Sequence, residues 1–288
     1  MQIHPVVVVA VLFGALLHAT WNALIKSSTD KSLDTALIHG LGAVIALPLL
    51  CVAGWPDAAA WPFIAATTIV HLGYYATLAA AYRHGDFGLT YPIMRGCAPL
   101  FVALSSPLFI GEQLSASAWM GIVVICLGVL LLGMTSRRGG GARSMRLALG
   151  FALLNALLIA SYTLIDGLGV RASGNALSYV AVLFLLDAFP YLGMTLWQRS
   201  PVQRQEAWQY MARRWPIAAL GTVASLSSYG IALWAMTRAP VAVVAALRET
   251  SVLFAVALGW LALREPLGWF KMGGAVTIVC GIWLLRLV

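Results

Sequence analysis

Charged residues are scarce in this chain, and they separate long apolar stretches at fairly even intervals. Of the 288 residues, 61% are hydrophobic and 10% are charged, and the mean hydropathy is +0.89. A helix needs about 20 apolar residues to cross a bilayer, and a charge at its centre costs several kcal/mol. The pattern therefore excludes a water-soluble fold and predicts that most of the chain lies in lipid.

Breaks in hydrophobicity divide the sequence into ten candidate membrane spans of about 20 to 25 residues each. The predicted spans are 4–26, 33–54, 61–82, 88–110, 115–134, 145–170, 175–197, 212–237, 240–263 and 267–287. The connections carry the glycine, proline, serine and charge that are typical of turns at the water surface. The first span lacks a basic leader and a small-residue cleavage site, so we expect it to be retained and not cleaved as a signal peptide.

Two segments of the chain repeat each other at a constant offset and without a gap. The aligned positions include Arg95 with Arg248, Glu112 with Glu265, Gly121 with Gly274 and Gly128 with Gly281. Upstream, with a somewhat different offset, residues 19–22 align with residues 160–163. We therefore predict an N-terminal five-helix repeat over residues 1–136 and a C-terminal one over residues 145–288, joined at SRRGGGARS.

An odd number of spans in each repeat has a geometric consequence. The second repeat must enter the membrane from the opposite side, which predicts an all-α integral membrane protein with ten transmembrane helices in two inverted five-helix repeats. Inverted repeats suit alternating access, because exchanging the conformations of the two halves turns an outward-open cavity into an inward-open one. The alternative is that the duplication only builds a large stable bundle.

Several short sequences resemble those of the EamA-type drug/metabolite transporter superfamily. They are Pro99-Leu100-Phe101, Gly111-Glu112-Gln113-Leu114 and Glu265-Pro266-Leu267, within two five-span repeats. The resemblance covers nearly the whole chain. Within the superfamily, the chain is similar to the ten-span exporters of amino acids, including aromatic ones. The resemblance implies export of a small metabolite, in the first place an amino acid. Small four-span members carry a glutamate in the first helix for coupling, but the first span here has no acid, so that scheme is not carried over.

Other functions remain as alternatives. A multidrug or nucleotide-sugar exchanger belongs to the same class, and a membrane sensor or scaffold would not transport at all. The sequence contains no G-x-x-x-x-G-K-[ST], H-E-x-x-H or G-x-S-x-G motif, so we do not expect an enzyme. We expect a monomer or homodimer in the cell membrane, the inner one in a Gram-negative cell, with a small-molecule substrate and membrane lipid as partners.

The cysteines and the basic residues do not indicate further partners. All four cysteines fall inside apolar stretches without a histidine partner, so we expect no disulfide, no metal site and no cofactor. The 18 lysines and arginines lie mainly in the short connections, which argues against nucleic acid binding. Their concentration in odd-numbered connections places both termini outside the cytoplasm, whereas members of the similar family usually have both termini inside.

Polar and aromatic side chains inside the spans should face the bundle interior or a water-filled cavity. The candidate substrate-binding residues are His18, Trp21, Asn22, His71, Tyr75, Tyr82, Arg95, Tyr162, Tyr229 and Arg248. Aromatic rings would stack on an apolar or aromatic side chain, while arginine and asparagine would hold polar ends. Alternatives are helix packing for Asn22, a membrane-interface position for Tyr82 and a buried neutral ring for His71.

Three charged residues lie well inside predicted spans. Arg95 and Arg248 could hold a substrate carboxylate bidentately, or they could anchor the structure, with Arg248 pairing with Glu249. Asp187 precedes Pro190 and is the candidate for proton coupling; the alternatives are a pair with an arginine or a role in bending the helix.

Four glycines recur at a spacing of seven residues in the fifth and tenth spans. These are Gly121, Gly128, Gly274 and Gly281. Glycines two helical turns apart form a groove that admits another helix closely. We therefore interpret them as helix-packing residues, between subunits or between the halves of one chain.

Overall fold

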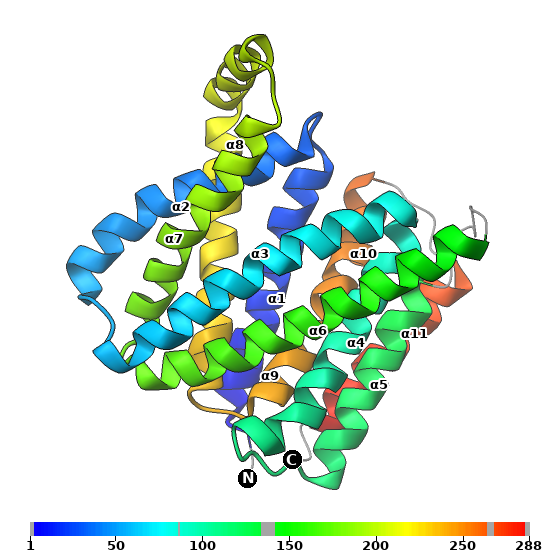
Figure 1. Ribbon diagram of the computed structural model, residues 1–288. Coiled ribbons are helices and arrows are strands. Elements are labelled where there is room, and N and C mark those ends of the chain that lie inside the picture. The colour runs from blue at the N-terminus through cyan, green and yellow to red at the C-terminus, as the bar shows by residue number, and fades with distance from the viewer. Residues whose placement is uncertain (1–2, 86, 134–141, 264–267, 286–288) are drawn as a thin grey trace.

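A computed structural model describes residues 3–85, 87–133, 142–263 and 268–285, and within these ranges the chain is helical and has no strand (Figure 1). The helices are α1 (Pro5–Lys26), α2 (Lys31–Ala53), the 3-10 helix η1 (Ala58–Ala60), α3 (Trp61–His84), α4 (Phe87–Phe109), α5 (Ala116–Gly133), α6 (Ala142–Ala172), α7 (Ala176–Trp197), α8 (Pro201–Met236), α9 (Val241–Arg248), α10 (Ser251–Leu263) and α11 (Trp269–Leu285).

The ten predicted spans correspond to ten helical segments. Of the described segments, nine are long and apolar enough to cross a membrane, with α9 and α10 together making one of them, and α11 is a shorter apolar helix of 17 residues. The predicted fold class is therefore confirmed. Most of the predicted junction SRRGGGARS lies outside the described residues.

Two predicted spans differ from the observed helices. The eighth span was expected to begin at residue 212, but α8 begins at Pro201 because Ser200 and Gln203 form a reciprocal cap. The Ser200 hydroxyl accepts from the Gln203 amide at 3.3 Å, and the Gln203 side chain accepts from the Ser200 amide at 2.9 Å. Part of the connection QRSPVQRQEAWQ is thus helical. The ninth span is broken between Arg248 and Ser251.

Contacts between α2 and α7 show that the two halves of the chain have opposite directions. Asp30 caps the start of α2 and pairs with Arg199 just beyond the end of α7, at 2.7 Å. Asn175 caps the start of α7 and donates to the carbonyl of Ala53 at the end of α2, at 3.2 Å. Each helix therefore starts where the other ends. The two helices thus run antiparallel and contact each other at both ends, as expected for equivalent helices of an inverted repeat.

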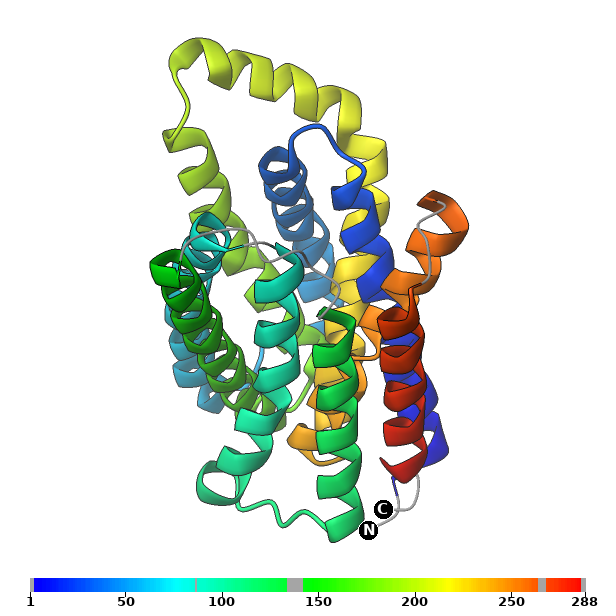
Figure 2. The same cartoon turned by 90° about the vertical axis from the view of Figure 1, so that its right-hand side faces the viewer.

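The helices α5 and α11 meet with their backbones in close contact (Figure 2). A Cβ atom on Gly121 would lie 3.1 Å from the carbonyl oxygen of Gly281, and one on Gly128 would lie 2.9 Å from that of Gly274. Gly121 aligns with Gly274 in the repeat, and Gly128 aligns with Gly281. The crossing therefore has the two-fold symmetry of the repeat, and it joins the two halves of one chain.

The remaining helix pairs follow the same symmetry. The contact between α3 and α6 corresponds to that between α8 and α1, and the contact between α4 and α6 corresponds to that of α1 with α9 and α10. Each half, α1–α5 or α6–α11, thus packs mainly on the other half. The helices α1, α4, α6 and α9 surround the centre, and α1 begins and α11 ends at the same end of the bundle (Figure 1).

Replacing Gly128 with alanine should weaken the α5–α11 crossing. The new methyl group would lie 2.6 Å from Cγ1 of Ile278 as well as close to the α11 backbone, and overpacking of this kind costs roughly 1–3 kcal/mol. We expect Gly128→Ala to lower the melting temperature in detergent. Gly273→Ala is the matched control, because its methyl group would meet nothing within 4 Å. Equal melting temperatures for both variants would contradict the close crossing.

Candidate functional site

An ion pair between the two halves lies at the centre of the bundle. Arg95 of α4 and Glu249, which follows the end of α9, are 2.8 Å apart between Nε and Oε2, and their side chains are 11% and 5% exposed. A buried charge of this kind is costly in a membrane unless it is paired. The expected alternative of an Arg248–Glu249 pair is thus wrong, because the carboxylate binds the arginine of the other half.

Arg248 has a different environment. Its guanidinium carbon lies 5.2 Å from the centre of the Tyr229 ring, and among the described residues no carboxylate lies within ion-pair distance of it. The repeat explains this difference, because the position equivalent to Glu249 is Gly96. A Cβ atom on Gly96 would lie 3.2 Å from the carbonyl oxygen of Cys126, so α4 packs closely against α5 at this position. In the second half the equivalent position, directly after α9, holds the acid Glu249.

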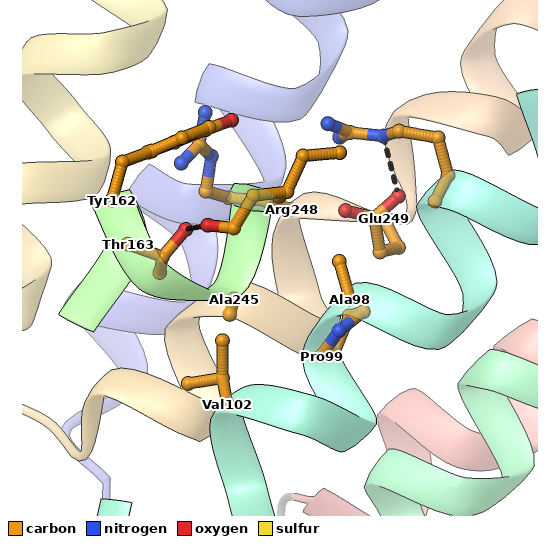
Figure 3. Close-up of a pocket in the computed structure, with 10 residues that line it drawn as sticks. Ala98, Pro99, Val102, Tyr162, Thr163, Ala245, Arg248 and Glu249 are labelled. Carbon is orange, nitrogen blue, oxygen red and sulfur yellow. Dashed lines mark hydrogen bonds and ion pairs between the residues drawn. The ribbon is translucent and has the colours of Figure 1, made fainter. Parts of the chain in front are cut away.

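A small cavity lies between these charged groups (Figure 3). It is lined by Arg95, Ala98, Pro99, Val102, Ile159, Tyr162, Thr163, Ala245, Arg248 and Glu249. Figure 3 shows Tyr162 and Arg248 on one side of the space and Glu249 on the other. About 10 Å³ is open to the centre of a water molecule, which is room for roughly one water. In this conformation the cavity does not admit a metabolite.

Aromatic and histidine rings continue from the cavity toward α2, α3 and α7. The ring of Tyr162 contacts that of His71, with centroids 4.8 Å apart. Tyr75 lies 6.3 Å from His71 and 5.1 Å from Tyr191, and Tyr191 stacks on His39 at 5.1 Å. These five rings, which we call the aromatic cluster, give the centre an apolar face beside its charges.

Asp187 contacts this aromatic cluster through His71. The His71 Nδ1 atom and the Asp187 Oδ2 atom are 2.8 Å apart, and the two side chains are 12% and 13% exposed. The pair joins α3 of one half to α7 of the other. The suggested arginine partner of Asp187 is therefore wrong, since a histidine takes that place.

Asp166 is a buried acid that the sequence reasoning missed. It lies in α6, and it accepts hydrogen bonds from Tyr179, at 3.0 Å, and from Tyr229. The guanidinium of Arg248 lies over the ring of Tyr229, so Tyr229 connects Asp166 to the cavity that Arg248 lines. An acid inside a predicted span was a signal that could have drawn attention to it.

Three of the predicted residues in α1 bind one another. The indole nitrogen of Trp21 donates to Nδ1 of His18 at 3.3 Å, and the Asn22 amide donates to the His18 carbonyl at 2.7 Å. They do not line the cavity, although His18 lies within electrostatic reach of Arg95 and Arg248.

The structure thus brings together only some of the candidate residues. Arg95, Arg248 and Tyr162 line the cavity, Tyr229 contacts Arg248, and His71 and Tyr75 belong to the adjoining aromatic cluster. Tyr82, near the end of α3, does not line the cavity, but it packs against the same apolar group as Tyr162.

Glu112, which was singled out only as part of a family motif, joins the halves at one end of the bundle. Its carboxylate lies 2.6 Å from Nη2 of Arg171 and accepts the Val241 amide at 2.9 and 3.1 Å. It therefore caps the start of α9 from the opposite half. Arg171 also donates to the carbonyl of Met236 at 2.9 Å. The equivalent Glu265 lies outside the described residues, as do Pro266 and Leu267.

Inverted helical repeats around a charged and aromatic centre are the architecture of secondary membrane transporters. Comparison with known proteins agrees: the sequence pattern of the EamA-like transporter family matches residues 6–134 and 146–287. The chain belongs to the EamA-like transporter family, and it is a multi-pass membrane protein.

Two further similarities are consistent with this family. The multidrug transporter EmrE of Escherichia coli (strain K12) is 31% identical over 77 residues, which cover 27% of this chain and 69% of EmrE. A solved crystal structure superimposes with a TM-score of 0.73 at 16% identity, covering 97% of this chain and 94% of the other. The second similarity shows the fold alone.

Replacing Glu249 with glutamine should leave Arg95 as an unpaired buried cation. Removing one partner of a buried ion pair costs about 3–5 kcal/mol, so we expect a clearly lower melting temperature for Glu249→Gln. The double variant Arg95→Gln/Glu249→Gln should recover part of the loss, because neither of the two positions then carries an unpaired charge. Glu206→Gln, which removes an exposed carboxylate on α8, serves as the control. An unchanged melting temperature for Glu249→Gln would contradict the pairing.

Proposed function

We propose that this chain transports small molecules that carry a carboxylate, in the first place amino acids, through the centre of the bundle by alternating access. We further propose that the physiological direction is export, as the similarity to amino acid exporters implies. The observation that supports this proposal is the difference between the two repeat-related arginines. Arg95 is neutralised by Glu249, whereas the position that would neutralise Arg248 is Gly96.

An arginine without a carboxylate partner is well suited to bind an anionic substrate. A guanidinium presents its donors in a fork that matches a carboxylate bidentately, and the bond is stronger where water is excluded. Tyr162 lines the same cavity and connects it to the aromatic cluster. A substrate whose carboxylate binds Arg248 would place an apolar or aromatic side chain against these rings.

Polar contacts between the halves occur at both ends of the bundle, which supports alternating access. Glu112 holds Arg171 and the start of α9 at the end where α1 begins. At the other end Asp30 pairs with Arg199, and Asp34 pairs with Arg214 at 2.6 Å. Because the cavity is too small for a substrate, loading from either side would require one of these two sets to separate.

Exchange of labelled amino acids in proteoliposomes tests the proposal. Wild-type protein should exchange one or more members of a panel of the common amino acids across the membrane. Arg248→Gln should raise the KM for exchange by roughly 10- to 100-fold, since a hydrogen bond to a charged group contributes about 1.5–3 kcal/mol. Arg248→Lys should raise the KM less, because lysine keeps the positive charge but lacks the forked donors of the guanidinium.

The matched control is Arg238→Gln, which removes an arginine that lies over Trp234 after the end of α8, 4.5 Å from the ring centre. It should exchange amino acids like the wild type. Failure to exchange any amino acid, with protein shown to be folded, would overturn the proposal and favour a sensor or scaffold.

Multidrug transport is a second candidate, because one relative is named a multidrug transporter. The aromatic cluster would offer a surface for apolar drugs. A labelled drug that the protein exchanges equally well before and after Arg248→Gln would favour this candidate over a carboxylate substrate.

A further inference from the structure

The hydrogen-bonded pair of His71 and Asp187 lies beside the arginine site, where His71 contacts Tyr162, and binding of a carboxylate by Arg248 does not use the charge of this pair. We propose that this pair is a proton-binding site through which a proton gradient drives transport. The inference rests on the transport function proposed above. It adds the coupling ion, the two residues that bind it and the reason why binding depends on the position of the two halves.

The net charge of the His71–Asp187 pair depends on whether the pair itself binds a proton. The ionisable groups that face it are Tyr74 and Tyr75 on α3, Tyr162 and Asp166 on α6, His39 on α2 and Tyr191 on α7. Within the described part of the chain, no lysine or arginine lies at ion-pair distance from Asp187. The histidine is therefore the group that can neutralise this carboxylate.

The other acids described above have partners whose charge does not change near neutral pH. Glu249 is bound to Arg95, Glu112 is bound to Arg171, and Asp166 is held by two tyrosine hydroxyls. Arginine does not lose its proton in proteins, so the first two pairs keep a fixed charge. Histidine is the side chain whose ordinary charge change falls near neutral pH. Among these acids, only Asp187 has a partner whose charge a physiological proton gradient can change.

The two charge states of the pair differ greatly in what they cost inside a membrane. With one added proton on the imidazole, His71 and Asp187 form an ion pair of no net charge. Without it, a net charge of −1 remains among aromatic rings. An unpaired charge in a low-dielectric interior is costly, so the proton should leave only where water reaches the pair.

The position of the pair between the halves couples this release to the transport cycle. His71 belongs to α3 and Asp187 belongs to α7, so rocking of one half against the other changes which side of the membrane has access to them. A proton that binds from one side is then released to the other side. One proton crosses per cycle, and no other group needs to change its charge.

The test uses proteoliposomes that contain the full chain and the labelled amino acid that is exchanged fastest. The membrane potential is held at zero with potassium and valinomycin, and a gradient of one pH unit is imposed. With one proton per cycle, the wild type should accumulate the amino acid up to about tenfold, the ratio of proton concentrations. The sign of accumulation shows whether proton and substrate move together or in opposite directions.

Asp187→Asn and His71→Gln should respond to the gradient with an accumulation ratio of 1. Each response is divided by the exchange rate of the same variant without a gradient, which corrects for any loss of folded or active protein. Asp187→Glu keeps a carboxylate and should recover part of the response. Glu206→Gln is the matched control and should accumulate the amino acid like the wild type.

The outcomes separate the two proposals. Wild-type protein that exchanges amino acids but ignores the pH gradient would overturn proton coupling and leave transport intact. A full response in both Asp187→Asn and His71→Gln would also overturn the inference, because the proton would bind elsewhere. Absence of exchange with every amino acid would overturn the transport function and the coupling with it.

Discussion

A charged side chain inside a membrane needs a partner, and the centre of this protein is arranged around that requirement. Arg95 and Arg248 are equivalent in the repeat, yet among the described residues Arg95 pairs with a carboxylate, that of Glu249 in the other half, and Arg248 does not. The break between α9 and α10 places this acid at the centre. Because glycine occupies the equivalent position 96, the symmetric ion pair is not formed, and the proposed substrate carboxylate takes that place at Arg248.

The two-fold symmetry extends through most of the helix contacts. The α5–α11 glycines make the same contact twice, with the roles of the halves exchanged, and α2 and α7 contact each other at both ends. In the proposed mechanism, this symmetry relates two conformations in which the halves exchange their shapes. The charge of the centre departs from this symmetry, because the position equivalent to Glu249 is Gly96.

Much of the fold could be predicted from the sequence, because a membrane span and an inverted repeat leave patterns over tens of residues. The prediction for α8 was too short because the polar and charged segment after Ser200 was interpreted as a connection, although Ser200 and Gln203 cap a helix there. The ion pair between Arg95 and Glu249 could not be predicted, since residues 154 positions apart meet only through packing of the halves. His71 and Asp187 were both singled out, but their contact depends on how α3 and α7 pack.

Binding of an amino acid and of its amide tests the role of Arg248 most directly. The amide keeps the side chain and the amino group of the ligand but removes the carboxylate charge. With purified protein and an amino acid that it exchanges, we expect the amino acid to raise the melting temperature and the matching amide to raise it much less. In Arg248→Gln the two ligands should have similar effects. Equal stabilisation of the wild type by both ligands would contradict a carboxylate site at Arg248.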